Sequence, residues 1–175
     1  MNKNTYQLKL YWKRLLRYID LARYIFFGKY KPSYIENAIP VKDGTVIEYL
    51  NKLNQFMKDN FYYKYDVIDF AKHPYSFYED KNGDCDDFSL MALFCLRKQG
   101  IESNLMIVFK EGEGHAVCVV KDEQGNYHHI SNWGVVSAFN SLDAVASNVF
   151  PDLTSWWLMS YNLSIIEYKQ VGGVK

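Results

Sequence analysis

The segment whose residue types most clearly suggest catalytic chemistry is KNGDCDDFSL, at residues 81–90. It places Cys85 directly after Asp84 and before two further aspartates, at the point where an apolar run predicts a helix. A cysteine with only a packing role usually lies among apolar neighbours. If Asp84 caps the helix, the positive end of the helix dipole favours a Cys85 thiolate with a pKa below the ordinary value of about 8.5. The pattern indicates a nucleophile whose first-turn amides stabilise an oxyanion.

The aspartates beside this thiol work against ionisation, so a nearby cation is needed, and histidine is its usual source. His115 is the best placed of the four histidines, because it opens a predicted strand after the glycine-rich turn EGEG. His73 lies in a predicted loop, where we expect a solvated ring. His128 and His129 are strand neighbours and must point to opposite faces. Their spacing is a poor chelate, and we predict no metal and no cofactor.

A catalytic histidine needs a partner that orients its second ring nitrogen. The strand YHHISN is the expected hairpin mate of the strand HAVCVVKD, and the end of the second strand then lies opposite the start of the first. This register places Ser131, Asn132 and Trp133 beside His115. The amide oxygen of Asn132 can accept the imidazole N–H, and Trp133 can shield that bond from water.

Hydrophobic periodicity predicts the elements that position these residues. Helices are expected over residues 5–27, over 44–60, from Cys85 to a stop at Gly100, and over 141–149. Strands are expected over residues 103–110, 115–122, 127–132 and 163–169. The stretch 28–44 is typical of a linker, and 61–84 shows little regular pattern. The order predicts an α+β fold with N-terminal helices and a central cysteine-bearing helix packed on an antiparallel sheet.

Composition sets broad limits on the kind of protein. The chain has 175 residues, of which 49% are apolar, enough for one domain with a sizeable core. Three cysteines without a CxxC pair argue against a disulfide framework and a thiolate zinc site, and favour a reduced, cytoplasmic setting. No apolar run approaches the roughly 20 residues of a membrane span, and charges interrupt the N-terminus where a signal peptide would be apolar.

Charge is unevenly spread along the chain. Residues 1–31 hold eight Lys and Arg against one acid, Asp20, so the remaining residues carry a net negative charge. We predict a basic amphipathic helix in 1–31, ahead of a catalytic domain in 32–175. The simpler expectation is that its apolar stripe packs on the domain while its charges face water. The alternative is an arm for an anionic surface or a protein partner, with nucleic acid the least expected.

Several of these motifs together resemble the transglutaminase-like superfamily of papain-related thiol enzymes. The family pattern has an HP turn, a Gly-x-Cys-x-Asp/Glu helix start, and an apolar helix ending in Leu-Arg-x-x-Gly-Ile. A strand starting with Gly-His-Ala and a hairpin strand carrying Asp or Asn follow. This chain has HPYSFYEDKNGDCDDFSLMALFCLRKQGIES, then GHAVCVV, then GNYHHISNWG, which spans roughly residues 45–135.

The resemblance implies a Cys-His-Asp/Asn triad that transfers an acyl group from an amide. Carried over by position, Cys85 is the nucleophile and His115 the general base. The family's Asp falls on Ser131, one residue before Asn132. We choose Asn132, because an amide oxygen is the better permanent acceptor for an imidazolium.

Three functions follow from the resemblance. The first is a cysteine peptidase or amidase acting on a peptide or protein amide. The second is transfer to an amine, crosslinking protein glutamine. The third is an inactive binding or structural module. The family's second oxyanion donor lies upstream of the cysteine, in a region lined by Tyr75, Phe77 and Tyr78, and the sequence does not assign it to one residue.

Overall fold

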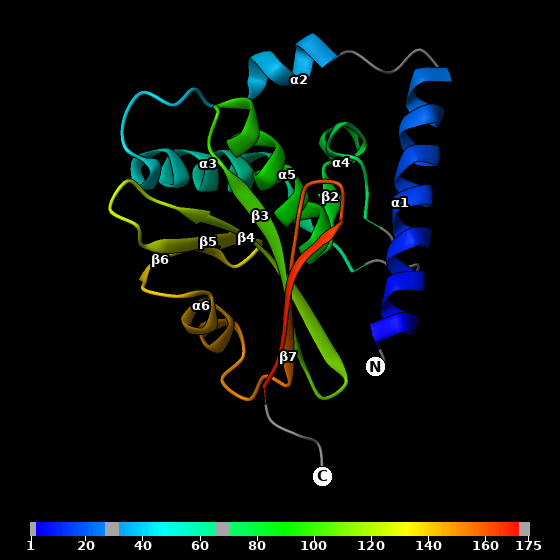
Figure 1. Ribbon diagram of the computed structural model, residues 1–175. Coiled ribbons are helices and arrows are strands. Elements are labelled where there is room, and N and C mark those ends of the chain that lie inside the picture. Colours follow the sequence, from blue (N-terminus) through cyan, green and yellow to red (C-terminus); the bar gives the residue numbers. More distant parts are fainter. Residues whose placement is uncertain (1–2, 27–31, 66–70, 172–175) are drawn as a thin grey trace.

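The computed structural model describes residues 3–26, 32–65 and 71–171 (Figure 1). Its helices are α1 (Lys3–Phe26), α2 (Pro32–Ala38), α3 (Val46–Asn60), α4 (Pro74–Asp80), α5 (Cys85–Lys98) and α6 (Leu142–Val149). Its strands are β1 (Tyr62–Tyr63), β2 (Asn82–Gly83), β3 (Ser103–Lys110), β4 (Glu113–Lys121), β5 (Tyr127–Ser131), β6 (Gly134–Phe139), β7 (Ser155–Met159) and β8 (Ile165–Gln170). None of the helices in the described ranges is long and apolar enough to cross a membrane.

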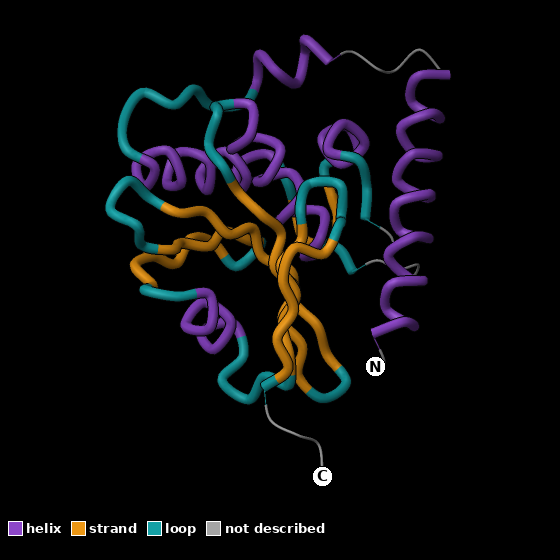
Figure 2. The backbone as a smooth tube through the Cα atoms, in the orientation of Figure 1, coloured by secondary structure: helices purple, strands orange, loops and turns teal. Residues whose placement is uncertain are grey.

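The long strands form one six-stranded antiparallel sheet in the order β6-β5-β4-β3-β7-β8 (Figure 2). Strand alternation gives the sheet two apolar faces. Leu105 and Ile107 of β3 share a core with α3, α4 and α5, whereas Met106 and Val108 share one with α6. The helices therefore cover both faces, and the predicted α+β class is confirmed.

Helix α5 is the centre of the larger core. Eleven of its fourteen residues are buried, from Asp86 to Leu96. It begins at Cys85 behind the N-cap Asp84, as the sequence predicts, and it ends just before Gly100, which has a φ of +71°. A left-handed residue at this position ends a helix, and glycine adopts it without strain.

Six elements escape the periodicity argument, among them the two-residue strands β1 and β2, which lie in the stretch 61–84. Helices α2 and α4 lie in the predicted linker and the predicted irregular stretch, and β6 and β7 extend the expected sheet. Two turns of helix are too short to show a 3.6-residue period, but proline marks both starts. Pro32 opens α2, and Pro74 follows the N-cap His73 in α4.

Helix α1 packs the face opposite to the expected one. Arg17 and Asp20 are buried against the domain and Lys13 is half-buried, whereas Leu15 and Ile19 face solvent. The expectation that the apolar stripe packs on the domain is wrong. Polar partners on the domain select the charged side of the helix, as the contacts below show.

Candidate active site

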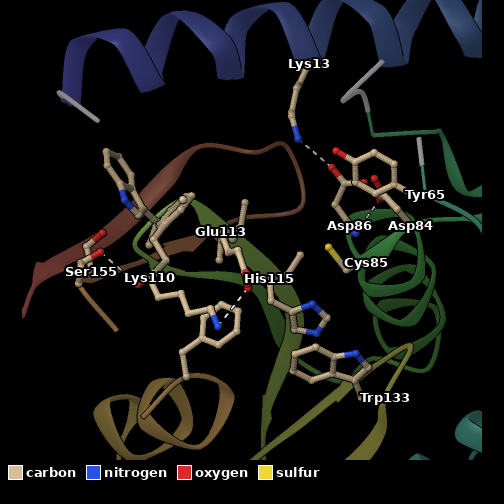
Figure 3. A pocket seen from close by; sticks show the side chains of 18 of the residues that line it. Lys13, Tyr65, Asp84, Cys85, Asp86, Lys110, Glu113, His115, Trp133 and Ser155 are labelled. Carbon is tan, nitrogen blue, oxygen red and sulfur yellow. Dashed lines mark hydrogen bonds and ion pairs between the residues drawn. The ribbon is translucent and has the colours of Figure 1, made fainter. Parts of the chain in front are cut away.

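A cleft of about 810 Å³ lies at the N-terminal end of α5, where that helix meets the start of β4 (Figure 3). Both Cys85 and His115 line it. The remaining lining residues come from α1, the segment around β1, the start of α5, the β5–β6 turn, and strands β3, β4 and β7 with their loops: Lys13, Tyr63, Tyr65, Asp84, Asp86, Ile107, Phe109, Lys110, Gly112, Glu113, Gly114, Ala116, Trp133, Phe150, Thr154, Ser155 and Trp157. The thiol and the imidazole face this common hollow, as predicted from a sequence separation of 30 residues (Figure 3).

The helix start that holds Cys85 is a complete capping box. The Asp84 carboxylate accepts from the backbone N–H groups of Asp86 and Asp87, and the Asp87 carboxylate accepts in return from the Asp84 N–H at 3.2 Å. Such a box satisfies the otherwise unpaired amides of a first turn. It leaves the Cys85 N–H outside the reciprocal pair, on the turn that borders the cleft.

The other two aspartates, Asp86 and Asp87, are buried. Asp87 also accepts from the backbone N–H of Lys72 at 2.7 Å. Asp86 lies 2.9 Å from the ammonium of Lys13 on α1. The two buried carboxylates thus have different partners, a backbone amide for Asp87 and a basic residue of the N-terminal helix for Asp86.

Ala116 ties the nucleophile to the histidine strand. The backbone of Ala116, the residue after His115, lowers the pKa of the Cys85 thiol. Its carbonyl accepts from the Ser89 hydroxyl at 2.9 Å, and the same hydroxyl lies 2.7 Å from the Cys85 carbonyl. Helix α5 and strand β4 are thereby fixed to each other at the reacting groups.

His115 is held by aromatic contacts rather than by polar ones. Its ring stacks on Trp133, with centroids 3.5 Å apart and an angle of 9°, and Phe150 meets it edge-on at 6.5 Å. The predicted neighbourhood of His115 and Trp133 is therefore confirmed, and it follows from the antiparallel β4–β5 hairpin. The His115 Nε2 atom is buried and has no hydrogen-bond partner among the described residues.

Asn132 lies in the turn after β5, beside this stack. Its Oδ1 atom is buried and, like His115 Nε2, finds no hydrogen-bond partner within the described ranges. The hydroxyl of Ser131 accepts instead from the backbone N–H of Trp133 at 3.1 Å. Ser131 thus serves the local turn, and the Asn132 oxygen is an unused acceptor one residue away.

Burial dominates the ionisation of both candidate reacting groups. It raises the pKa of the Cys85 thiol to about 12, and the carboxylates of Asp86 and Asp84 add to the rise. Burial also lowers the pKa of His115 to about 4, with a smaller contribution from His129. Burial therefore favours the neutral form of both groups, which runs against the expectation of a thiolate pKa below the free value.

Among the described residues, one group of carboxylates is close enough to share a cation. Oxygens of Asp84, Asp86 and Asp87 all lie within 4.8 Å of one another. Backbone N–H groups and the Lys13 ammonium already bind oxygens of these carboxylates. The donor set is of the oxygen type that hard cations prefer.

Several site residues were missed or misplaced by sequence reasoning. Tyr63 and Tyr65 border the cleft because β1 pairs in parallel with β2, immediately before the nucleophile. The expected upstream residues Tyr75, Phe77 and Tyr78 are buried on α4 instead and do not line the cleft. A parallel pairing of two residues leaves no periodic signal in the sequence.

The other histidines take structural roles. His73 is not a solvated ring: its Nδ1 caps α4 by accepting from the Tyr75 N–H at 3.4 Å, and burial lowers its pKa to about 4. His128 pairs with Asp122 at 2.8 Å, and His129 with Asn148 at 3.0 Å. The two neighbours therefore have separate partners, as strand alternation predicts.

The arrangement defines a class: an α+β fold that presents a cysteine at the N-terminus of a buried helix and a histidine on the neighbouring strand, in one cleft. A family model described as the transglutaminase-like superfamily matches residues 35–143. The chain belongs to this superfamily, as the resemblance predicts.

Two solved structures of LapG from Legionella pneumophila share the fold. The calcium-bound form has a TM-score of 0.52 and 20% sequence identity, covering 71% of this chain and 70% of LapG. The EGTA-treated form has a TM-score of 0.50 and 18% identity, covering 85% of this chain and 83% of LapG. At this identity the likeness concerns the fold alone. No curated protein matches the chain.

Proposed function

We propose that the protein is a cysteine peptidase or amidase that hydrolyses an amide bond in a peptide or protein. One observation carries the proposal: Cys85, at the start of α5, and His115, on the neighbouring strand β4, line the same cleft. The superfamily membership agrees with thiol chemistry on amides.

In the proposed reaction, the Cys85 sulfur attacks the amide carbonyl while its proton passes to His115. The C–N bond then breaks as His115 protonates the departing amine, leaving an acyl thioester. A water molecule, deprotonated by His115, cleaves the thioester and releases the carboxylic acid and the free thiol. The Cys85 N–H at the helix start stabilises the oxyanion in both steps.

We assign the Asn132 oxygen to orient the imidazole in this cycle. It is buried, unused and next to the His115–Trp133 stack, whereas Ser131 is engaged with its own turn. When His115 takes the thiol proton, the imidazolium gains an N–H that needs an acceptor, and the Asn132 amide oxygen supplies one.

The raised pKa of Cys85 favours a second candidate, a binding module without catalysis, because a neutral thiol is a weak nucleophile. The two are separated by incubating the protein with dimethylated casein and measuring newly formed amines. We expect Cys85→Ala to reduce the rate at least about a thousandfold, as the loss of a nucleophile does. The matched control is Cys95→Ala, at a buried cysteine of the same helix outside the cleft.

Equal rates for wild type and Cys85→Ala would contradict the peptidase and favour the module. Fluorescent cadaverine, added to the same incubation, separates hydrolysis from amine transfer. Incorporation of the amine into casein that depends on Cys85 would assign the site to crosslinking instead.

A further inference from the structure

The outward side of α1 is an apolar surface that the proposed chemistry does not use. Trp12 is 58% exposed, Leu15 48% and Ile19 55%. The exposed apolar residues of this helix recur at spacings of three and four, and we call them the outer stripe: Tyr11, Trp12, Leu15, Tyr18, Ile19, Ala22, Ile25 and Phe26. A continuous apolar stripe of this size facing solvent indicates an interaction surface.

The opposite side of α1 is polar and is fixed to the domain. Lys13 pairs with Asp86 at 2.9 Å, and the Asp20 carboxylate accepts from the backbone N–H of His73 at 3.2 Å. Arg17 donates to the carbonyl of Tyr161 at 2.9 Å, and its guanidinium lies 4.5 Å from the centre of the Tyr161 ring. Rolling the helix to bury the stripe would break all of these contacts, so the outer stripe stays outward.

We propose that the outer stripe docks α1 in the plane of an anionic lipid membrane. Charge complementarity selects this occupant. The segment 1–31 carries eight basic residues and one acid. Asp20, Lys13 and Arg17 contact the domain, which leaves six basic residues and no acid in the rest of the segment. Basic residues of interfacial helices pair with the phosphates of anionic lipids, so this excess of positive charge favours an anionic surface.

The residue types of the outer stripe also favour a lipid membrane as its partner. Tyr and Trp, which combine an apolar ring with a polar group, favour the boundary between lipid and water, and the stripe holds Tyr11, Trp12 and Tyr18. A single helix offers a convex face, which a fluid surface accepts without a matching groove. A second copy would bring two strongly basic segments together, and their repulsion opposes that pairing.

Docking in this way also sets the position of the cleft. Lys13 points from α1 to Asp86, beside the nucleophile, on the side of the helix away from the outer stripe (Figure 3). The cleft therefore lies below the helix, about one helix diameter, ~10 Å, from the lipid surface. Substrates would be met close to the membrane.

The test is co-sedimentation of the full chain with phosphatidylcholine vesicles containing about one third phosphatidylglycerol. We expect the wild type to bind, and Leu15→Glu/Ile19→Glu to bind at least about tenfold more weakly, because two apolar anchors become anionic. The matched control is Val41→Glu/Ile166→Glu, which adds the same charge at residues that are 69% and 56% exposed elsewhere. The control should bind within about twofold of wild type, and unchanged circular dichroism should show that both variants fold.

Four results would overturn the proposal. The wild type could ignore the vesicles, or the stripe variant could bind as well as the control. Equal binding to pure phosphatidylcholine would remove the anionic requirement. Stripe-dependent dimerisation in sedimentation equilibrium, or stripe-dependent binding to polyglutamate, without vesicle binding would assign the surface to a second copy or to an acidic protein.

Discussion

Helices α1 and α5 are both amphipathic or apolar by sequence, yet they attach to the protein in opposite ways. Helix α5 buries nearly its whole surface in the core between α3, α4 and the sheet. Helix α1 attaches through Lys13, Arg17 and Asp20 and leaves its apolar stripe in solvent. Periodicity therefore identified the apolar face of each helix, but it identified the packed face of only one.

The difference lies in what the domain offers to each helix. Around α5 the surrounding faces are apolar, so burial of the helix is favourable without specific partners. Opposite α1 the domain presents the buried carboxylate of Asp86, a backbone carbonyl at Tyr161 and a backbone N–H at His73. Leaving such groups unpaired in a buried setting is costly, so they select the charged side of the helix.

Among the substitutions that test this comparison, Lys13→Met is expected to have the largest effect on stability. The substitution leaves the Asp86 carboxylate buried without its ammonium, and breaking such a pair lowers the free energy of unfolding by about 3 kcal/mol. It also removes a cation that lowers the pKa of Cys85, so iodoacetamide should alkylate Cys85 more slowly. Urea unfolding and the alkylation rate, followed by mass spectrometry, measure the two effects.

The control for this variant is Lys52→Met, which removes the ion pair with Asp43 on the surface of α3. Both partners of that pair are well exposed, so no change in stability is expected. If Lys13→Met is as stable as Lys52→Met, α1 is not held by its charged side, and the contrast between the two helices fails.

The second prediction concerns stability at acidic pH and compares one histidine beside each helix. Burial lowers the pKa of both His73, near α1, and His115, near α5, to about 4, from about 6.5 in the unfolded chain. The unfolded state then binds more protons, so stability is complete above pH ~6.5 and falls as the pH drops toward ~4. At pH ~5, the lowered pKa of each histidine should reduce the free energy of unfolding by about 2 kcal/mol relative to its value above pH ~6.5.

Melting temperatures measured across this pH range check the assignment. His73→Asn keeps a capping acceptor for α4, and His115→Gln keeps a polar side chain, but neither residue titrates in this window. Each variant should remove roughly half of the acid sensitivity that these two histidines contribute. If the pH dependence of the melting temperature were unchanged in both variants, the loss of stability in acid would have to arise from other residues.

The smallest expected effect is at Ser89, which joins α5 to β4. Ser89→Ala removes the hydroxyl that bridges the carbonyls of Cys85 and Ala116, at a cost of about 1 kcal/mol. Because these carbonyls flank the reacting groups, we expect the variant to hydrolyse casein more slowly than wild type under conditions in which both proteins are fully folded. Ser103→Ala, at a buried serine with a longer 3.4 Å bond to Ile101, is the control and should leave hydrolysis unchanged.

Much of the fold and part of the candidate site could be predicted from the sequence. The Asp84 cap, the helix from Cys85 and the hairpin that brings Trp133 to His115 all depend on local signals, namely a capping residue, a turn and an alternating strand. Such signals act over a few residues, so a single sequence carries them.

The features that could not be predicted depend on the environment of each residue. Whether Asp86 is buried is decided by Lys13, 73 residues away, and the pKa of Cys85 follows from the burial of its helix start. The contribution of Tyr65 to the cleft depends on the short pairing of β1 with β2. None of these contacts leaves a periodic pattern in the chain.

The polar attachment of α1 has a consequence for the effect of salt on the protein. The Lys13–Asp86 pair is largely buried, with side chains that are 16% and 8% exposed, so added salt screens it only weakly. Leu21 of the same helix packs against the larger core, so release of α1 would expose apolar surface as well as charge. The contact between α1 and the domain should therefore persist at high ionic strength, and Asp86 should stay paired beside the nucleophile.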